Sequence, residues 1–425
     1  MAQLSDDCFA FGGALMSVEE AQALIAARIP PLPGEEMVPL MAARGRVLAR
    51  DLVAPIPLPP FFNAAVDGWA FRHDDLAYGG ETRLDEAGRV AAGHIPARPV
   101  GPGEAVRVFT GAPMPYGTDT CVMQEDVRHA GRSIMVPPGL KRGANARPAG
   151  EDIAQGATAL PAGRVLGPAE IGLAAALGQA RLPVRPRPRI GVFSTGDELV
   201  EPGAHLGPAQ TYDSNRFTLL ALLAGLPCDA VDLGIIPDHA ERTAAALGAA
   251  ARDHDLLLTS GGVSTGEEDH VRAAIEASGS LVFWRLAVKP GRPAAMGVLP
   301  RAGRDFASGG TPVVGLPGNP VAAVVCFLHL ARPLLLRLAG AQARPLPRYA
   351  AQADFDHRKK AGRREYVRVT LRTEGAVTRA QKFPREGAGL LTSLTHSDGF
   401  AELPEEVTRV APGDPVAVLP FAGLL

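Results

Sequence analysis

The spacing of hydrophobic and polar residues changes along this chain of 425 residues, and the clearest pattern lies in its second half. From residue 189 onward, short apolar runs alternate with segments whose apolar residues recur at helical spacing. The former predict buried strands and the latter predict amphipathic helices. The predicted strands are 190–193, 230–236, 256–258, 281–288 and 313–316, and the predicted helices are 214–223, 240–251 and 320–338. This alternation predicts a doubly wound, mostly parallel α/β sheet.

The first part of the chain predicts a different organisation. Residues 17–27 follow a helical pattern, with Ser17 as N-cap and Glu20 placed to complete a capping box. Residues 38–51 predict a second helix. Between residues 61 and 145, short β-type runs separated by Gly and Pro turns predict a β-rich module. Its clearest runs are 105–109, 120–124 and 133–136.

The C-terminal part again reads as β structure. Short runs such as 365–371 and 416–419 predict a small β domain of barrel type. A chain of 425 residues is too long for a single core, so we expect several domains. The predicted domains are a discontinuous helical and extended linker domain (14–51 plus 146–187), a β-rich domain (52–145), an α/β domain (188–339) and a C-terminal β-barrel-like domain (340–425).

Composition narrows the classes of function. A charged fraction of 21% and a net charge of −2 describe an ordinary globular protein without the basic stripe that nucleic-acid binding requires. The 4 cysteines lie far apart, which argues against a zinc site or a disulfide scaffold and suits a reducing cytoplasm. The N-terminus carries acids where a signal peptide would be basic. The apolar segment 321–335 is broken by charged residues and Pro333 and is too short to span a bilayer. We therefore expect a cytoplasmic protein with no membrane partner.

The stretch 255–269 carries the most informative chemistry. After the predicted strand 256–258, small residues form a turn whose backbone N–H groups can bind an anion: Ser260, Gly261, Gly262 and Ser264. Three acids follow, Glu267, Glu268 and Asp269. Acids suit the first turn of a helix. However, carboxylates beside a phosphate would repel it unless a metal ion lay between them.

Ligands of doubly wound sheets bind beyond the carboxyl ends of the strands. We expect four loops to meet there: 194–199, the surroundings of Asp238, 260–269 and 317–320. Their charged residues, with those of the nearby K-P-G-R-P turn, suit a phosphorylated ligand and a divalent ion: Glu198, Asp238, Asp269, Lys289 and Arg292. The sequence has neither G-x-G-x-x-G nor G-x-x-x-x-G-K-[ST], which disfavours a dinucleotide dehydrogenase and a P-loop ATPase.

Six motifs occur in a fixed order: T-G-A-P-M-P-Y-G-T-D, R-P-A-G-E-D-I, F-S-T-G-D-E-L, S-G-G-V-S-T-G-E-E-D, K-P-G-R-P and L-P-G-N-P. In this order the chain resembles the molybdopterin molybdenumtransferase family, whose unit also forms the C-terminal domain of gephyrin. The resemblance covers essentially the whole chain. It implies an elongated homodimer of four-domain subunits with the site between subunits. The implied reaction takes adenylylated molybdopterin and molybdate and, with Mg²⁺, yields molybdenum cofactor and AMP.

The resemblance also implies roles for individual residues, carried over by motif. The implied catalytic residues are Asp67, Asp152, Glu198 and Asp269. The implied substrate-binding residues are Thr110, Arg147, Ser260, Gly261, Gly262, Ser264, Lys289, Arg292, Pro317 and Arg368. The implied Mg²⁺ ligands are Glu198, Asp238 and Asp269. Implied partners are other cofactor-biosynthesis proteins and the molybdoenzymes that receive the cofactor.

The sequence departs from the family pattern at four positions. Phe62 stands where the family has an aspartate, Ala64 and Ala388 where it has serines, and Arg292 where it has a second lysine. The first two changes remove polar groups from the implied intersubunit site. An alternative is therefore a molybdopterin-binding paralogue or scaffold with weak or altered transfer of molybdate or tungstate. An unrelated phosphate or nucleotide-sugar hydrolase on the same fold is a third hypothesis, which the absence of its usual motifs disfavours.

Overall fold

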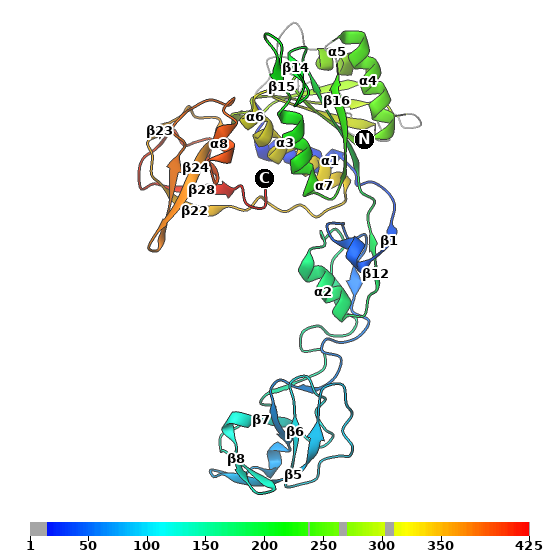
Figure 1. The fold of residues 1–425 in the computed structure, drawn as a ribbon, viewed down its shortest axis with the longest axis vertical. Coiled ribbons are helices and arrows are strands. Elements are labelled where there is room, and N and C mark those ends of the chain that lie inside the picture. The colour runs from blue at the N-terminus through cyan, green and yellow to red at the C-terminus, as the bar shows by residue number, and fades with distance from the viewer. Residues whose placement is uncertain (1–14, 237–238, 263–269, 302–309, 425) are drawn as a thin grey trace.

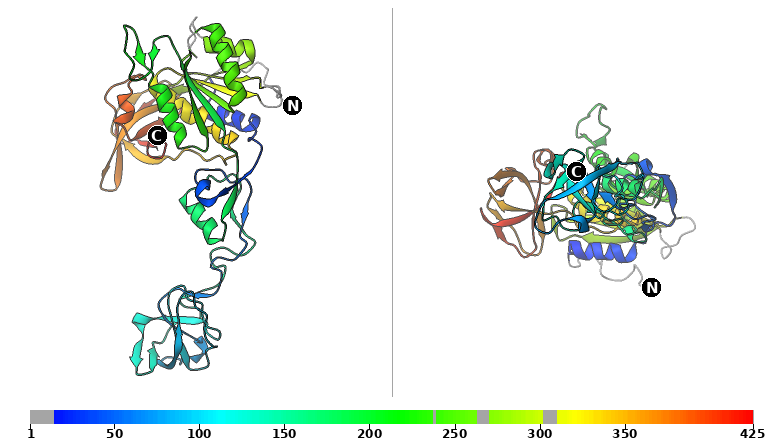
Figure 2. Two further views of the ribbon diagram at one scale, coloured as in Figure 1. Left: turned by 45° about the vertical axis from the view of Figure 1, so that its right-hand side comes forward. Right: turned by 90° about the horizontal axis from the view of Figure 1, so that it is seen from below.

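The computed structural model describes residues 15–236, 239–262, 270–301 and 310–424. The molecule is elongated (Figures 1 and 2). An α/β sheet and a β-barrel lie side by side at one end, a β-rich lobe forms the other end, and a slender region connects them.

The α/β domain contains a six-stranded sheet with the order β16–β13–β17–β21–β20–β18. Four strands are parallel: β16 (Asp229–Ile236), β13 (Arg189–Thr195), β17 (Leu256–Ser260) and β21 (Thr311–Leu316). The edge strands β20 (Pro293–Leu299) and β18 (Ser280–Arg285) are antiparallel. A small parallel pair, β14 (Leu199–Val200) and β15 (Thr211–Tyr212), lies above this sheet. The predicted fold class of this domain is confirmed, although β20 was not predicted.

Helices cover both faces of the sheet, as doubly wound folds require. One face packs against α1 (Val18–Arg28), α3 (Asn215–Ala224), α6 (Pro320–Cys326) and α7 (Arg332–Leu338), and the other against α4 (Ala240–Asp253) and α5 (His270–Ser278). The α1 capping box is confirmed, because Ser17 and Glu20 exchange hydrogen bonds between side chain and backbone.

The most apolar helical segment runs from Pro320 to Leu338, through a π-helical turn at Phe327–Ala331. By length and composition it could cross a membrane, with a mean hydropathy of 1.8. However, 78% of this apolar window is buried inside the protein, where it forms the centre of the largest core. Burial among the other elements of the domain explains its apolar character.

The slender region is built by pairing segments that are distant in sequence. Its elements are β1 (Glu36–Pro39) with β12 (Arg181–Val184), β2 (Leu52–Val53) with β11 (Thr158–Leu160), the short 3₁₀ turn η1 (Leu40–Ala43) and α2 (Pro168–Ala176). The helix predicted over 38–51 is therefore wrong. Gly45 has a φ of +73°, which ends any helix, and Leu48 bridges to Val184 in the core. Pairing with a distant strand overrides the local periodicity.

The β-rich lobe is a six-stranded sheet with the order β7–β4–β6–β5–β9–β8. Its strands are β4 (Gly68–Phe71), β5 (Thr82–Val90), β6 (Glu104–Val108), β7 (Thr120–Met123), β8 (Arg128–Ala130) and β9 (Ser133–Val136). A short pair, β3 (Asn63–Ala64) and β10 (Ala146–Arg147), joins it to the slender region, and two 3₁₀ turns are η2 (His73–Asp75) and η3 (Gln124–Asp126).

The C-terminal domain is a closed barrel, because β24 pairs with both β25 and β26. Its strands are β22 (Tyr349–Ala353), β24 (Arg364–Glu374), β25 (Val377–Lys382), β26 (Gly399–Leu403) and β28 (Pro415–Pro420). A pair outside the barrel wall, β23 (His357–Arg358) with β27 (Arg409–Val410), and the short helix α8 (Thr392–Thr395) complete it. The predicted barrel is confirmed. Strand β19 (Val288–Lys289) of the α/β domain pairs with β24 and ties the two domains together.

Candidate functional site

The carboxyl ends of three neighbouring strands, β13, β17 and β21, meet at one edge of the α/β sheet. Ser260 is aligned with Ser194 on one side and Leu316 on the other. Asn215, the first residue of α3, donates hydrogen bonds to Ser260 Oγ and to the Gly318 carbonyl, both at 2.7 Å. One side chain therefore holds the Ser260 turn against the L-P-G-N-P loop.

The glycines of the Ser260 turn permit a close approach to β13. Gly261 and Gly262 have φ angles of +92° and +64°. A Cβ on Gly262 would lie 2.7 Å from Thr195 Oγ1 and 2.7 Å from Val271 Cγ2, and a Cβ on Gly261 would lie 2.9 Å from the Thr195 carbonyl oxygen. Positive φ and these contacts both require glycine here.

The atoms offered at this edge are oxygens. Glu198 is exposed in the turn after β13, and its carbonyl accepts a hydrogen bond from Thr211 N at 2.8 Å. Thr195 Oγ1 and Asn215 Oδ1 are buried and have no hydrogen-bond partner among the described residues. Pro317 is buried and its carbonyl accepts a hydrogen bond from Ser260 Oγ at 3.4 Å.

Three of the predicted site residues, Asp238, Ser264 and Asp269, lie outside the described residues. Within the part of the chain that the structure describes, no group of three or more His, Cys, Asp or Glu side chains is placed to hold a metal ion. Of the three predicted Mg²⁺ ligands, the structure thus places Glu198 alone.

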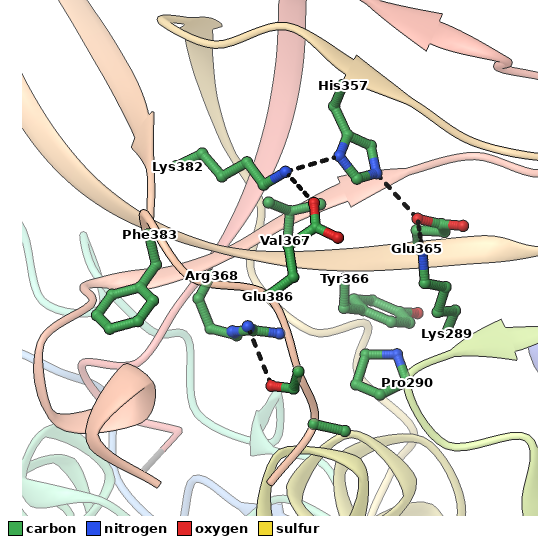
Figure 3. Close-up of a pocket in the computed structure, with 12 residues that line it drawn as sticks. Lys289, Pro290, His357, Glu365, Tyr366, Val367, Arg368, Lys382, Phe383 and Glu386 are labelled. Carbon is green, nitrogen blue, oxygen red and sulfur yellow. Dashed lines mark hydrogen bonds and ion pairs between the residues drawn. The ribbon is translucent and has the colours of Figure 1, made fainter. Parts of the chain in front are cut away.

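A second feature is a pocket of about 190 Å³ where the K-P-G-R-P turn meets the barrel (Figure 3). Two predicted residues line it, Lys289 and Arg368, together with Ala388, one of the departures from the family pattern. Arg292 is exposed and is not among its lining residues. The Ala388 carbonyl accepts a hydrogen bond from Val321 N at 3.0 Å, so the pocket rests on the first turn of α6.

Cations outnumber acids in this pocket, and one buried acid, Glu365, holds Lys289. Arg368 donates hydrogen bonds from Nη2 to the carbonyls of Arg385 and Gly387, each at 3.2 Å. Lys289 Nζ lies 3.2 Å from Glu365, whose side chain is only 3% exposed. Burial raises the pKa of the Glu365 carboxyl, but hydrogen bonds from His357 and Lys289 outweigh burial and hold this pKa below its ordinary value.

Sequence reasoning missed four residues of this pocket: His357, Glu365, Lys382 and Glu386. They come from separate parts of the barrel and form no local motif. The one sequence signal is Glu365, an acid that directly precedes Tyr366 and Val367 at the start of a predicted strand.

In the β-rich lobe, Asp67 and Thr110 form a direct pair. Asp67 Oδ1 accepts hydrogen bonds from Thr110 N at 2.8 Å and from Thr110 Oγ1 at 2.9 Å. These two donors lower the pKa of Asp67. The two residues lie 43 positions apart, so the fold brings together two predicted site residues.

Arg147 ends β10, which pairs with β3, Asp152 follows five residues later, and both are exposed. Arg147 Nε is 3.9 Å from Glu151 Oε2, and the Asp152 backbone N–H donates to the Leu58 carbonyl at 2.9 Å. Figure 1 shows the β-rich lobe at the opposite end of the molecule from the α/β sheet. A single chain therefore does not bring these residues to the carboxyl edge of that sheet.

Comparison with known families covers nearly the whole chain. Residues 16–178 match the family described as MoeA N-terminal region (domain I and II), residues 191–337 the probable molybdopterin binding domain, and residues 350–421 the MoeA C-terminal region (domain IV). The molybdopterin molybdenumtransferase of Haemophilus influenzae is 36% identical over 97% of this chain and 100% of its own length. The chain belongs to the molybdopterin molybdenumtransferase family.

A second relative and a solved structure are also similar to this chain over most of its length. Molybdopterin molybdenumtransferase 2 of Mycobacterium tuberculosis is 35% identical over 90% of this chain and 94% of its own length. The crystal structure of the molybdopterin biosynthesis protein moeA from Pyrococcus horikoshii OT3 superposes with a TM-score of 0.78, at 28% identity over 95% of this chain and 99% of that one. The family resemblance stated from the motifs is confirmed.

Proposed function

We propose that this protein is a molybdopterin molybdenumtransferase that inserts molybdenum from molybdate into adenylylated molybdopterin with release of AMP. The observation that carries the proposal is the cationic pocket of Lys289 and Arg368, which is connected to the glycine turn of the α/β sheet through the L-P-G-N-P loop and the start of α6. An oxyanion pocket and a phosphate-type turn are the two sites that this reaction needs.

The glycine turn is proposed to bind the pyrophosphate of the substrate. Backbone N–H groups at the end of a parallel strand suit phosphate oxygens. Ser260 is already fixed by Asn215, so its hydroxyl needs little ordering when the substrate binds. Ser264 and Pro317 are proposed to complete this contact.

Mg²⁺ is proposed to be held by Glu198 together with Asp238 and Asp269. The oxygen atoms that the described edge offers, from Glu198, Thr195 and Asn215, are of the kind that Mg²⁺ and its bound waters prefer. Bound Mg²⁺ would neutralise the pyrophosphate and polarise it for cleavage. We assign no protein nucleophile; water or a molybdate oxygen is proposed to attack phosphorus.

Molybdate is proposed to bind to Lys289 and Arg368, with Arg292 contributing from the rim, because cations bind oxyanions through charge-assisted hydrogen bonds. The substrate's own dithiolene sulfurs would receive the metal. The described cysteines support this division of labour, since burial raises the pKa of Cys121, Cys228 and Cys326 to about 12 each. Thiols of that kind are poor metal ligands at neutral pH.

We further propose a homodimer in the cytoplasm, with four domains at the boundaries given above. The site residues of the β-rich lobe and its junction would then act at the α/β edge of the other subunit: Asp67, Thr110, Arg147 and Asp152. The α/β edge of their own subunit lies at the opposite end of the molecule from this lobe. Contacts with other cofactor-biosynthesis proteins and with recipient molybdoenzymes are part of this proposal.

A scaffold that binds molybdopterin without transfer is the second candidate, favoured by Ala388, which leaves a methyl group in the oxyanion pocket. The cations that remain in that pocket favour the enzyme. To decide, purified protein is incubated with adenylylated molybdopterin, molybdate and Mg²⁺, and AMP and active cofactor are both measured. We expect both products. Tight substrate binding without either product would identify the scaffold, and AMP alone would show an altered oxyanion step.

A further inference from the structure

Lys382, the last residue of β25, reaches into the pocket of Lys289 and Arg368 although it belongs to none of the family motifs (Figure 3). Its Nζ lies 3.1 Å from His357 Nδ1 and 2.6 Å from Glu386 Oε1. An ammonium group has three N–H donors, so these two contacts leave one donor for a ligand.

The contact with His357 fixes the orientation of both side chains. A protonated lysine can only donate, so His357 Nδ1 is the acceptor and its proton sits on Nε2. That Nε2 lies 3.0 Å from Glu365 Oε2, the same carboxylate oxygen that Lys289 Nζ approaches at 3.2 Å. One carboxylate, 3% exposed, therefore positions Lys289 directly and Lys382 through His357.

The two acids of the pocket differ in how firmly they are held. The Glu365 side chain is buried and has three cationic or N–H partners, Lys289, His357 and, at 3.8 Å, Arg363. The Glu386 side chain is 71% exposed, whereas Lys382 is 22% exposed. Ion pairs with an exposed partner contribute little to stability. Glu386 can therefore leave Lys382 at low cost, while Glu365 stays in place.

We infer that Lys382 is a further oxyanion-binding residue, positioned by Glu365 and His357, and that Glu386 is a counter-ion displaced by the tetrahedral dianion. This inference rests on the proposed molybdenumtransferase function. Lys382 lines the same pocket as Ala388, where the family pattern has a serine, and supplies a charged donor in a pocket that lacks that hydroxyl. Glu386 keeps the empty pocket from holding an unbalanced excess of positive charge.

The test measures molybdate affinity of the full-length protein by calorimetry, and the KM for molybdate in cofactor formation. Lys382→Met is expected to weaken molybdate binding and raise the KM for molybdate about tenfold, with little change in kcat. A tenfold loss corresponds to one charge-assisted hydrogen bond. Glu386→Gln is expected to tighten binding several-fold. In the double variant K382M/E386Q the gain from Glu386→Gln should be clearly smaller than in the single variant, because Glu386 then no longer competes with molybdate for Lys382 and only its direct repulsion of the anion is removed.

Matched variants separate binding from folding. Arg372→Met removes an exposed cation of β24 that does not line the pocket and should leave molybdate affinity unchanged. His357→Gln keeps a donor and an acceptor and should retain more affinity than His357→Leu. Unchanged affinity in Lys382→Met, or a gain from Glu386→Gln that is equally large without Lys382, would overturn this inference but not the proposed function. A wild-type protein that binds no molybdate and makes no cofactor would overturn the proposed function itself.

Discussion

The Asp67 carboxylate accepts hydrogen bonds from both the backbone N–H and the side-chain hydroxyl of Thr110 in the β-rich lobe. This double contact fixes the orientation of the Asp67 side chain. It also keeps the carboxyl ionised, because both donors favour the charged form. The lobe that carries the pair lies far along the molecule from the α/β sheet. In the proposed dimer, this pair would enter the site of the other subunit as a preformed unit.

Replacing the hydroxyl should change the titration of Asp67. Because folding lowers this pKa, the contribution of the pair is present above the ordinary pKa of aspartate and is lost as pH falls through the lowered value. Thr110→Ala removes one of the two donors, so the pKa of Asp67 should rise towards its ordinary value and the acid limb of the activity profile should move to higher pH. Thr110→Ser keeps the hydroxyl and serves as control. Identical carboxyl titrations by NMR in the two variants would contradict this role.

Gly262 should not tolerate a side chain. Gly262→Ala places a Cβ 2.7 Å from Thr195 Oγ1 at a φ of +64°, which should destabilise the protein by about 1–3 kcal/mol and raise the KM for adenylylated molybdopterin. Gly248→Ala is the control, since it lies in α4 with no atom within 4 Å of the new Cβ. That change should stabilise by about 0.5–1 kcal/mol in denaturant unfolding. Equal effects of both substitutions would refute the close-approach argument.

The Glu365 carboxylate should stabilise the folded protein by an amount that depends on pH. Its folded pKa is lowered, so its contribution is present above the ordinary pKa of glutamate and is lost as pH falls through the lowered value. Glu365→Gln should cost about 1–3 kcal/mol at about neutral pH, because Lys289 and His357 lose a charged acceptor. The cost should shrink towards low pH, where the wild-type carboxyl is also protonated. Unfolding measured at several pH values tests this, and a cost that does not depend on pH would contradict it.

Asp269 is expected to be a Mg²⁺ ligand rather than a helix-capping acid. Asp269→Asn should lower the rate of adenylate cleavage at least about 100-fold, with substrate binding largely retained, because a neutral amide cannot replace the carboxylate at the metal. Glu268→Gln is the neighbouring control, which should stay close to wild type. Near-normal AMP release by Asp269→Asn would exclude this role.

Local sequence patterns predicted the fold best where one segment carries its own signal. The helix Val18–Arg28 has its capping box, and the strands Arg189–Thr195 and Leu256–Ser260 contain the short apolar runs from which they were predicted. The prediction failed over residues 38–51, whose periodicity is helical but whose backbone pairs with β12, more than a hundred residues away. Non-local pairing of this kind leaves no trace in a short window.

The site residues were likewise predicted where a local pattern marks them and missed where only the fold brings them together. Lys289 was predicted from the K-P-G-R-P motif and Arg368 from its place inside a predicted strand, and the structure places both in one pocket. Lys382 and His357 were missed because they lie 25 residues apart, and the pairing of β22 with β25 brings their segments together. The separation of Asp67 from the α/β edge is likewise a property of the whole chain, visible only in three dimensions (Figure 2).

The central claim is that one active site combines the β-rich lobe of one subunit with the α/β edge and oxyanion pocket of the other. Mixing subunits tests it most directly. Asp67→Asn and Lys289→Met are each expected to be nearly inactive as pure proteins. After the two are unfolded and refolded together in equal amounts, half of the dimers are mixed, and each mixed dimer has one site free of both substitutions. Cofactor formation should then recover to about a quarter of the wild-type level. If the mixture stays as inactive as its parents, every site lies within one chain and the account is wrong.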